Sequence, residues 1–372
     1  MAGIYLHIPF CFKRCDYCDF FKTTNISLKS EFLNVLEKEI DKNSDFIDNA
    51  TIETIYFGGG TPSALNVSEV KNILDLILIN EKNRNAIKEI TFELNPDDGS
   101  HQYLNELKKT DINRLSIGIQ SFDDRLLKLL NRRHNVGQAR VVVENARKAG
   151  FENISIDLMY GLPTMDMETW IRSIDEAINL HVEHISAYHL TYEKGTVFNK
   201  KLKRGIFNEI PEEKSVEQFK ILIDKLKKAG YEHYEISNFS LPAKKSKHNS
   251  SYWSGSKYIG LGPSAHSFDG TKRYWNVSDM SRYLNGEFTE KEEILTDADR
   301  YNEMVMLRLR TSEGLSEDGL NMMQTKYQNY FLDSVKKHIT TGNVVFDKGR
   351  YFISTRGIFI SDFIISELFI YD

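Results

Sequence analysis

The sequence predicts an α/β fold in which a partial, TIM-like barrel of six β/α units precedes a smaller, mainly helical C-terminal domain. The first observation is that six short β-rich runs alternate with stretches whose apolar residues fall at helical spacing. Such alternation indicates βαβ crossovers and a parallel sheet. The second observation is that the pattern becomes mainly helical after about residue 290. Six consecutive units favour a barrel over a flat sheet.

The six predicted strands lie 25–50 residues apart, as β/α units require. They are Ile4–Ile8, Ile52–Phe57, Glu89–Glu93, Arg114–Ile119, Asn153–Asp157 and His184–Tyr188. The connecting segments predict amphipathic helices, for example at Val70, Ile73, Leu74 and Ile77. These positions share one face of a helix, which would pack on the sheet.

The second half of the chain has a different residue pattern. Glu212–Gly230 predicts one amphipathic helix that ends at a glycine. Residues 231–280 are rich in Tyr, Trp, Ser, Asn, His and Gly and show little periodicity. Val344–Phe346 and Tyr351–Ile353 predict a hairpin, which with its flanking helices resembles a winged-helix unit. We therefore predict a barrel over 1–205, a helix and ligand-binding region over 206–289, and a winged-helix-like domain over 290–372.

Charge and composition exclude several classes of function. The 372 residues carry a formal charge of −5. Residues 290–372 contain ten Lys/Arg and fourteen Asp/Glu, so 10 − 14 = −4. These values argue against nucleic-acid binding by the winged-helix-like domain. The apolar tail Gly357–Tyr371 is interrupted by Asp362 and Glu367, and we see no secretory signal. We expect a cytoplasmic protein.

The three cysteines lie within eight residues, at Cys11, Cys15 and Cys18. An odd number at such short spacing is a poor disulfide framework and indicates thiolate ligands for a metal in a reducing compartment. Three thiolates can hold a [4Fe–4S] cluster with one iron left open. The alternatives are a zinc site completed by His7 and a redox dithiol of Cys15 and Cys18.

Each predicted strand is followed by a polar or glycine-rich sequence. The sequences are Cys11–Cys18, Gly58–Pro62, Glu93–Pro96, Gln120–Phe122, Asp157–Pro163 and Tyr188–Leu190. The carboxyl ends of parallel strands share one rim, where ligands bind in barrels of this class. We therefore expect these segments to form a single large site.

The cysteine spacing directly after a first strand resembles the radical S-adenosylmethionine (SAM) superfamily. Further runs resemble the oxygen-independent coproporphyrinogen oxidase family, with its HemN decarboxylases and HemW heme chaperones. These runs are Tyr5–Cys11, Phe57–Pro62, Gly118–Phe122 and Asp157–Pro163. The resemblance implies a radical-SAM barrel with a [4Fe–4S] cluster on Cys11, Cys15 and Cys18, and SAM as a second cofactor.

The resemblance also implies a set of SAM-binding residues along the rim. They are Tyr5, Tyr17, Gly59, Gly60, Thr61, Glu93, Gln120, Arg132 and Asp157. Glu93 would accept from the SAM ammonium group, and Arg132 would donate to its carboxylate. Gln120 and Asp157 would hold the ribose and nearby polar groups. The glycines would let backbone N–H groups approach the ligand closely, and the two tyrosines would flank the cluster and the adenine.

Two departures favour the HemW branch over the HemN branch. Phe20 stands where HemN proteins have a fourth cysteine. Only ten residues precede Cys11, so the N-terminal arm of the HemN pattern is missing. We therefore expect a heme chaperone rather than an enzyme, with a porphyrinogen decarboxylase as the alternative. A zinc-structured binding module is the third hypothesis.

One further motif concerns heme itself. His248, Asn249, Tyr252 and Trp253 resemble the HNxxYW heme-binding motif. We expect His248 to bind the iron, with His266 as a second candidate, and Lys244, Lys245 and Lys247 to pair with the propionates. The resemblance implies heme and acceptor apoproteins as partners, and no nucleic acid. It leaves open a peripheral contact with membrane-bound acceptors and the oligomeric state.

Overall fold

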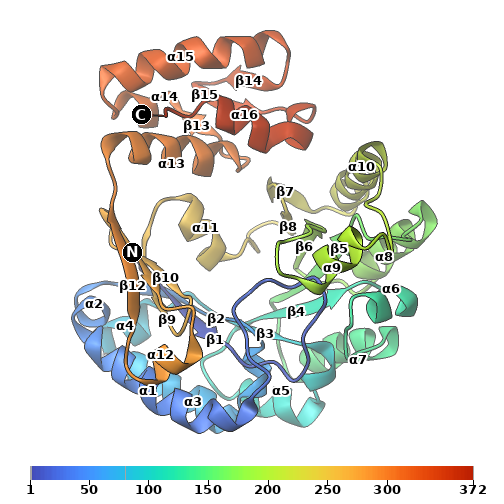
Figure 1. Ribbon diagram of the computed structural model, residues 1–372, viewed down its shortest axis with the longest axis vertical. Helices are drawn as coiled ribbons and strands as arrows, with labels where there is room; N and C mark the ends of the chain where they lie inside the picture. The colour runs from blue at the N-terminus through green and yellow to red at the C-terminus, as the bar shows by residue number, and fades with distance from the viewer. Residues whose placement is uncertain (1, 80, 372) are drawn as a thin grey trace.

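The computed structural model describes residues 2–79 and 81–371 and confirms the predicted α/β barrel (Figure 1). Its six consecutive parallel strands start within two residues of the predicted positions. They are β1 (Ala2–Ile8), β2 (Ile52–Gly59), β3 (Glu89–Leu94), β4 (Arg114–Gln120), β5 (Ile154–Tyr160) and β6 (His184–His189). Neighbouring strands pair in chain order from β1 to β6, as expected for right-handed βαβ units.

Ten α-helices follow these strands within the first 228 residues. They are α1 (Lys29–Lys42), α2 (Ser44–Asn49), α3 (Val67–Ile77), α4 (Glu81–Ala86), α5 (His101–Leu107), α6 (Asp124–Leu129), α7 (Val136–Lys148), α8 (Met167–Asn179), α9 (Val197–Lys203) and α10 (Glu212–Lys228). Short 3₁₀ turns occupy Ile26–Leu28, Pro62–Ala64 and Pro96–Asp98. Helix α3 buries Val70, Ile73, Leu74 and Ile77, the face that the sequence predicts.

The sheet is wider than the sequence indicates. Strand β9 (Lys257–Leu261) lies parallel to β1, and β10 (His266–Phe268), β11 (Lys272–Asn276) and β12 (Thr289–Ile294) extend that edge antiparallel. Strands β8 (Asn238–Ser240) and β7 (Glu232–Glu235) extend the β6 edge, which gives a twelve-stranded open sheet. Two helices, α11 (Lys247–Trp253) and α12 (Met280–Leu284), lie between these strands in the sequence.

Strands β7 to β12 were missed because they are only three to six residues long and their side chains do not alternate regularly between buried and exposed. Strand β12 is the clearest case, since its six residues are all at least partly exposed. It also belongs to the large sheet while crossing residue 290. The three-part division of the chain therefore stays a prediction.

The C-terminal part has its own apolar core (Figure 1). Its elements are α13 (Asp297–Leu309), β13 (Leu315–Ser316), α14 (Glu317–Asn321), α15 (Thr325–Thr340), β14 (Val344–Asp347), β15 (Arg350–Ile353), a 3₁₀ turn (Gly357–Ile360) and α16 (Ser361–Glu367). The predicted hairpin is present as β14 and β15, and β13 adds a short third strand. Within the described residues, we find no helix with the length and apolarity that a membrane crossing needs.

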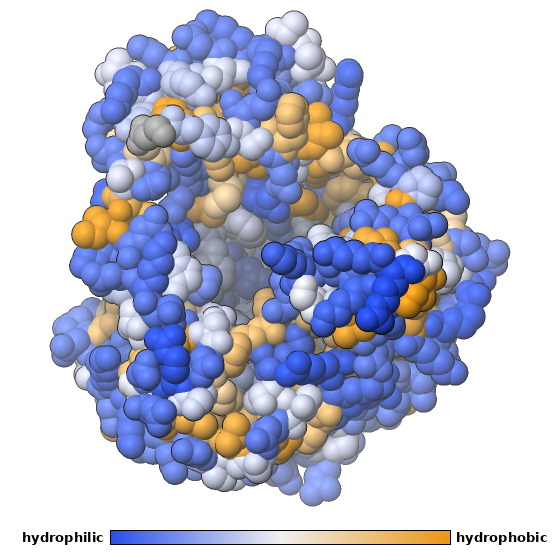
Figure 2. Space-filling model, viewed as in Figure 1, coloured by the Kyte–Doolittle hydropathy of each residue, from blue (hydrophilic) through white to orange (hydrophobic). Residues whose placement is uncertain are grey.

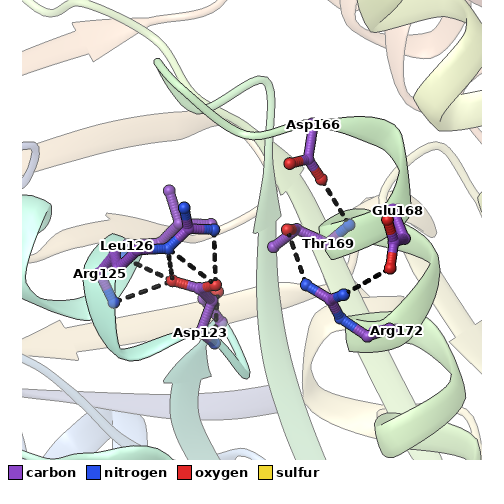
Figure 3. A network of polar contacts seen from close by, with 8 residues as sticks. Asp123, Arg125, Leu126, Asp166, Glu168, Thr169 and Arg172 are labelled. Carbon is purple, nitrogen blue, oxygen red and sulfur yellow. Dashed lines mark hydrogen bonds and ion pairs between the residues drawn. The ribbon is translucent and has the colours of Figure 1, made fainter.

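Two helices on the outside of the barrel, α6 and α8, begin at carboxylate caps (Figure 3). The Asp123 carboxylate accepts hydrogen bonds from the backbone N–H groups of Arg125 and Leu126, at 2.8 and 3.2 Å. Asp166 caps α8 in the same way through the N–H of Thr169, at 2.7 Å. Each carboxylate satisfies donors that have no partner within the helix.

We predict that Asp123→Ala lowers the free energy of unfolding by about 1 kcal/mol, because the first turn of α6 loses its cap. Urea denaturation followed by circular dichroism measures this change. Arg125→Ala is the matched control, since it removes only the exposed ion pair with Asp123. The control should cost less than about 0.5 kcal/mol. Equal losses in the two variants would contradict the capping account.

Candidate functional site

The three cysteines lie in one loop that leaves the carboxyl end of β1. The loop is closed at its base, where the N–H of Cys11 donates to the carbonyl of Thr23 and the N–H of Thr23 donates to the carbonyl of Pro9. Its far side is held by Lys201, whose ammonium lies 2.6 Å from the Asp16 carboxylate. The thiols are therefore presented by an ordered loop at the rim of the barrel.

All three cysteines are free thiols. Cys11 is buried and its sulfur lies 3.4 Å from the Thr61 hydroxyl, whereas Cys15 and Cys18 are partly exposed. Burial raises the pKa of Cys11, so a positively charged group is needed to hold it as a thiolate. A metal centre would supply that charge.

The arrangement of the side chains around the three cysteines counts against a single zinc ion. Among residues 2–79 and 81–371, no three His, Cys, Asp or Glu side chains are placed to hold one ion. His7 is also committed elsewhere: its Nδ1 lies 3.2 Å from the Tyr5 hydroxyl and its Nε2 2.8 Å from the Phe21 carbonyl. A four-iron cluster holds its thiolates at separate corners, so it does not require the three sulfurs to converge on one ion.

The glycine loop after β2 packs against the end of β1. Gly59 has a φ of +104°, and a Cβ there would come within 2.7 Å of the His7 ring. A Cβ on Gly60 would come within 2.8 Å of the Ile8 carbonyl. Two of the backbone N–H groups expected to face a ligand have partners within the protein. The N–H of Gly60 donates to Ile8, and a backbone hydrogen bond from Gly59 reaches Glu93.

Two carboxyl groups face the inside of the barrel near the cysteines. Burial raises the pKa of Glu93 to about 7, although the Tyr56 hydroxyl donates to it at 2.6 Å. Burial likewise raises the pKa of Asp157 to about 6. Both side chains keep partial exposure, so a ligand can reach them. A bound cation would stabilise the charged form of both carboxylates and so offset the effect of burial.

Arg132 links the rim to the cysteine loop. One guanidinium nitrogen lies 3.3 Å from the sulfur of Cys15, and the other donates to the Asn95 side chain at 2.6 Å and to the Gly118 carbonyl at 2.5 Å. The sequence argument did not single out Asn95, although it directly follows β3 within a segment assigned to the rim. Its position at a strand end was the available signal.

The remaining rim residues lie in the same region. Burial raises the pKa of Tyr17, whose phenol also interacts electrostatically with Arg132 and Cys15. Gln120 is buried at the end of β4 with a φ of +69°, and its amide points toward Gly118. Tyr5 stacks on Tyr56 inside the barrel. The structure therefore brings all nine expected SAM residues to one end of the barrel and its interior.

The HNxxYW segment forms α11, which lies against the amino-terminal halves of β1, β2 and β3. The Glu89 carboxylate caps this helix by accepting the N–H groups of Lys247 and His248, at 2.9 and 3.0 Å. His248 is 1% exposed. Its Nδ1 lies 2.9 Å from the Thr54 hydroxyl and its Nε2 2.8 Å from the Tyr252 hydroxyl.

These contacts argue against His248 as the iron ligand. Neither ring nitrogen is available, and burial lowers the pKa of His248 to about 3. Asn249 also does not face the large cavity described below, whereas Tyr252 and Trp253 line it. Lys245 and Lys247 line a neighbouring cavity that shares Trp253, Ser254, Ser256 and Arg308 with the large one, and Lys244 contacts the Glu152 carbonyl. The three lysines are therefore not placed to bind propionates in the large cavity.

The large cavity has a volume of about 670 Å³ and lies between the barrel rim and the C-terminal part. Figure 2 shows this face of the molecule hollowed between the upper lobe and the barrel. Its walls come from four places: Tyr5 and His7 of β1, residues 19–21 of the cysteine loop, the segment from α11 to β11, and α13 with the preceding Leu295. Much of the lining is aromatic or aliphatic, including Tyr252, Trp253, Tyr258, Phe268 and Met304.

Comparison with known proteins gives a consistent set of relatives. Residues 5–177 match the Radical SAM superfamily. The heme chaperone HemW of Bacillus subtilis is 37% identical over 85% of this chain and 85% of its own. The HemW of Lactococcus lactis is 33% identical over 95% of this chain and 93% of its own. Coproporphyrinogen III oxidase (HemN) of Escherichia coli matches all of this chain and 90% of its own with a TM-score of 0.85, at 22% identity, which shows a shared fold.

The raised pKa of Glu93 predicts how SAM binding depends on pH. If Glu93 accepts from the SAM ammonium group, as the resemblance implies, protonation of its carboxyl below about pH 7 removes that attraction. We expect the affinity for SAM to fall as pH is lowered from 8 to 6. Calorimetric titration of anaerobically reconstituted protein measures this. Glu93→Gln should bind SAM roughly tenfold more weakly at pH 8, with little further pH dependence. A variant that keeps the wild-type pH profile would contradict this role.

The lowered pKa of His248 predicts a pH-dependent stability. Because the folded pKa of about 3 lies below the ordinary 6.5, the unfolded chain binds the extra proton as pH falls from 6.5 toward 3. The folded protein then loses up to about 1.4 kcal/mol per pH unit. His248→Gln removes this contribution, so the stability difference between wild type and variant should shrink as pH falls. Urea unfolding measures it, with exposed His101→Gln as control. A difference that is constant with pH would refute the assignment.

Proposed function

The chain belongs to the family of HemW heme chaperones within the radical SAM superfamily, and on that premise we propose that it binds heme and transfers it to acceptor apoproteins. The proposed ligand follows from the names of its relatives and from the cavity beside the cysteine loop. The reducing compartment that its free thiols require supports a cytoplasmic location.

The cavity is the observation that carries this proposal. Its volume of about 670 Å³ falls within the roughly 300–1,000 Å³ typical of ligand pockets. Heme combines a flat apolar macrocycle with two carboxylates on one edge. The lining offers both counterparts: aromatic and methionine side chains, and three arginines at Arg273, Arg300 and Arg308.

The motif on α11 has a supporting role in this proposal. Tyr252 and Trp253 contribute to the cavity wall. Nε2 of His248 is hydrogen-bonded to the Tyr252 hydroxyl. The two rings also pack edge-on, with 5.0 Å between their centroids. We therefore propose that the motif shapes the heme site, with His248 positioning Tyr252 rather than contacting heme.

The cysteine loop joins the cluster region to the cavity. Asp19, Phe20 and Phe21 follow Cys18 directly and line the cavity, and Phe20 is 63% exposed. An exposed phenylalanine at this position offers apolar surface to a macrocycle. Cys11, Cys15 and Cys18 would hold the cluster, and Glu93 and Arg132 would bind SAM. When bound, the cluster supplies a one-electron redox centre next to the cavity.

Hemin titration of the anaerobically prepared protein tests the proposal. We expect saturable binding of one hemin per chain, with a shifted Soret band, followed by transfer to an apoprotein acceptor such as apomyoglobin. Cys15→Ser is the control for the cluster: it should lower the iron content but keep hemin binding, because no cysteine lines the cavity. Conversion of coproporphyrinogen III to its decarboxylated product, with SAM and reductant supplied, would overturn the chaperone proposal in favour of the decarboxylase.

A further inference from the structure

Two histidines line the large cavity, and they differ in what their ring nitrogens contact. His7 uses both nitrogens for Tyr5 and Phe21, as described above. His266 lies on β10 with an exposed side chain, and within the described part of the chain its ring nitrogens have no hydrogen-bond partner. His266 is therefore the cavity histidine with a free lone pair.

The ring of His266 is held in position by the fold. It meets Trp275, its cross-strand partner on β11, edge-on at 5.8 Å between ring centroids. The turn before β10 lies against β1: a Cβ on Gly262, which has a φ of +98°, would collide with the His7 carbonyl. This close approach sets the loop from Gly262 to His266 beside the end of β1. The imidazole consequently faces the cavity without needing to move.

Charge on the cavity wall is concentrated on α13. This helix buries Tyr301, Val305 and Leu309 in the C-terminal core and turns a different face to the cavity. That face carries Arg300 and Arg308. Neither guanidinium pairs with a carboxylate among the described residues, whereas Arg273 forms an ion pair with Glu303 at 2.7 Å.

We propose that His266 is the axial ligand of the heme iron in this cavity and that Arg300 and Arg308 bind the heme propionates. This assignment rests on the heme-binding function proposed above and adds the residues that hold the ligand. An imidazole nitrogen donates its lone pair to the iron, so the bond forms without transfer of an electron or proton to the protein. Arginine matches the fork geometry of a carboxylate better than lysine does.

Two further features of the cavity agree with this arrangement. Burial, together with the charge of Arg273, lowers the pKa of His266, so its ring is neutral at pH 7 and can act as a ligand. Phe268, Tyr252 and Met304 supply apolar surface around the same space. The macrocycle would therefore be covered by apolar groups while its carboxylates reach the arginines.

Hemin titration of the full chain under anaerobic conditions tests the axial ligand. In His266→Ala, we expect the Soret and electron paramagnetic resonance signatures of a histidine-ligated iron to disappear. Added imidazole should restore them, because it fills the space left by the missing ring. His101→Gln, at an exposed histidine that does not line the cavity, is the matched control and should keep the wild-type signatures, while His248→Gln tests the competing assignment. Circular dichroism and cluster iron content confirm that each variant is folded.

The propionate contacts are tested with hemin and its dimethyl ester, which lacks the two carboxylates. Wild type should bind hemin at least about tenfold more tightly than the ester, because the arginines contact only the acid form. Arg300→Ala combined with Arg308→Ala should remove most of that preference and leave the affinity for the ester nearly unchanged. A double variant that still discriminates as well as wild type would overturn the arginine assignment.

The outcomes separate this inference from the function on which it rests. If wild type binds one hemin and His266→Ala retains the wild-type ligand signature, His266 is not the ligand and the heme-binding function stands. If His248→Gln loses the signature while His266→Ala keeps it, the motif histidine is the ligand after all. If wild type shows no saturable hemin binding, both the inference and the proposed function are wrong.

Discussion

The packing around His7, at the carboxyl end of β1, is the constraint on which the rest of the site depends. The ring of His7 lies over Gly59, so only a glycine can end β2 there. Its Nε2 holds the Phe21 carbonyl and thereby the returning arm of the cysteine loop. Its own backbone lies against Gly262, which leads into the His266 turn. One buried residue therefore places the cysteine loop, the glycine loop and one wall of the cavity relative to each other.

A second consequence of the fold is the separation of two histidine environments. His248 fills space at the amino-terminal end of the barrel, where Thr54 and Tyr252 satisfy both of its nitrogens. A charge on this buried ring would lower the stability of the folded protein. Because both nitrogens already have partners, the ring needs no ligand. His266 stands at the cavity wall with its nitrogens unpaired. We therefore assign a structural role to His248 and the ligand role to His266 from their surroundings rather than from the motif.

Much of the architecture could be predicted from the sequence, for identifiable physical reasons. The six strands of the barrel are buried apolar runs, and the helices between them have clear apolar faces, as in α3. The cysteines were found because three of them within eight residues can scarcely serve anything but a shared ligand. Strands β7 to β12 could not be found, because short strands at a sheet edge lack the regular alternation that marks longer ones. The extension of the sheet past β1 by β9 was hidden for the same reason.

The candidate site could also be predicted only in part from the sequence. The rim residues such as Glu93 and Arg132 were identified because parallel strands end at a common edge. The direction in which a side chain points could not be predicted. Whether His248 faces the cavity depends on which face of α11 meets the barrel, and Lys245 precedes that helix. Arg300 and Arg308 were not considered, because nothing in the sequence indicates that α13 lies beside the cavity.

The central claim is that heme occupies the cavity beside the cysteine loop with its iron on His266. Anomalous diffraction at the iron edge, on crystals of the cluster-containing protein soaked with hemin, tests it most directly. The account predicts one peak at Cys11, Cys15 and Cys18 and a second, separate peak within bonding distance of a His266 nitrogen. A second peak next to His248, or at the outer surface away from the cavity, would contradict the account.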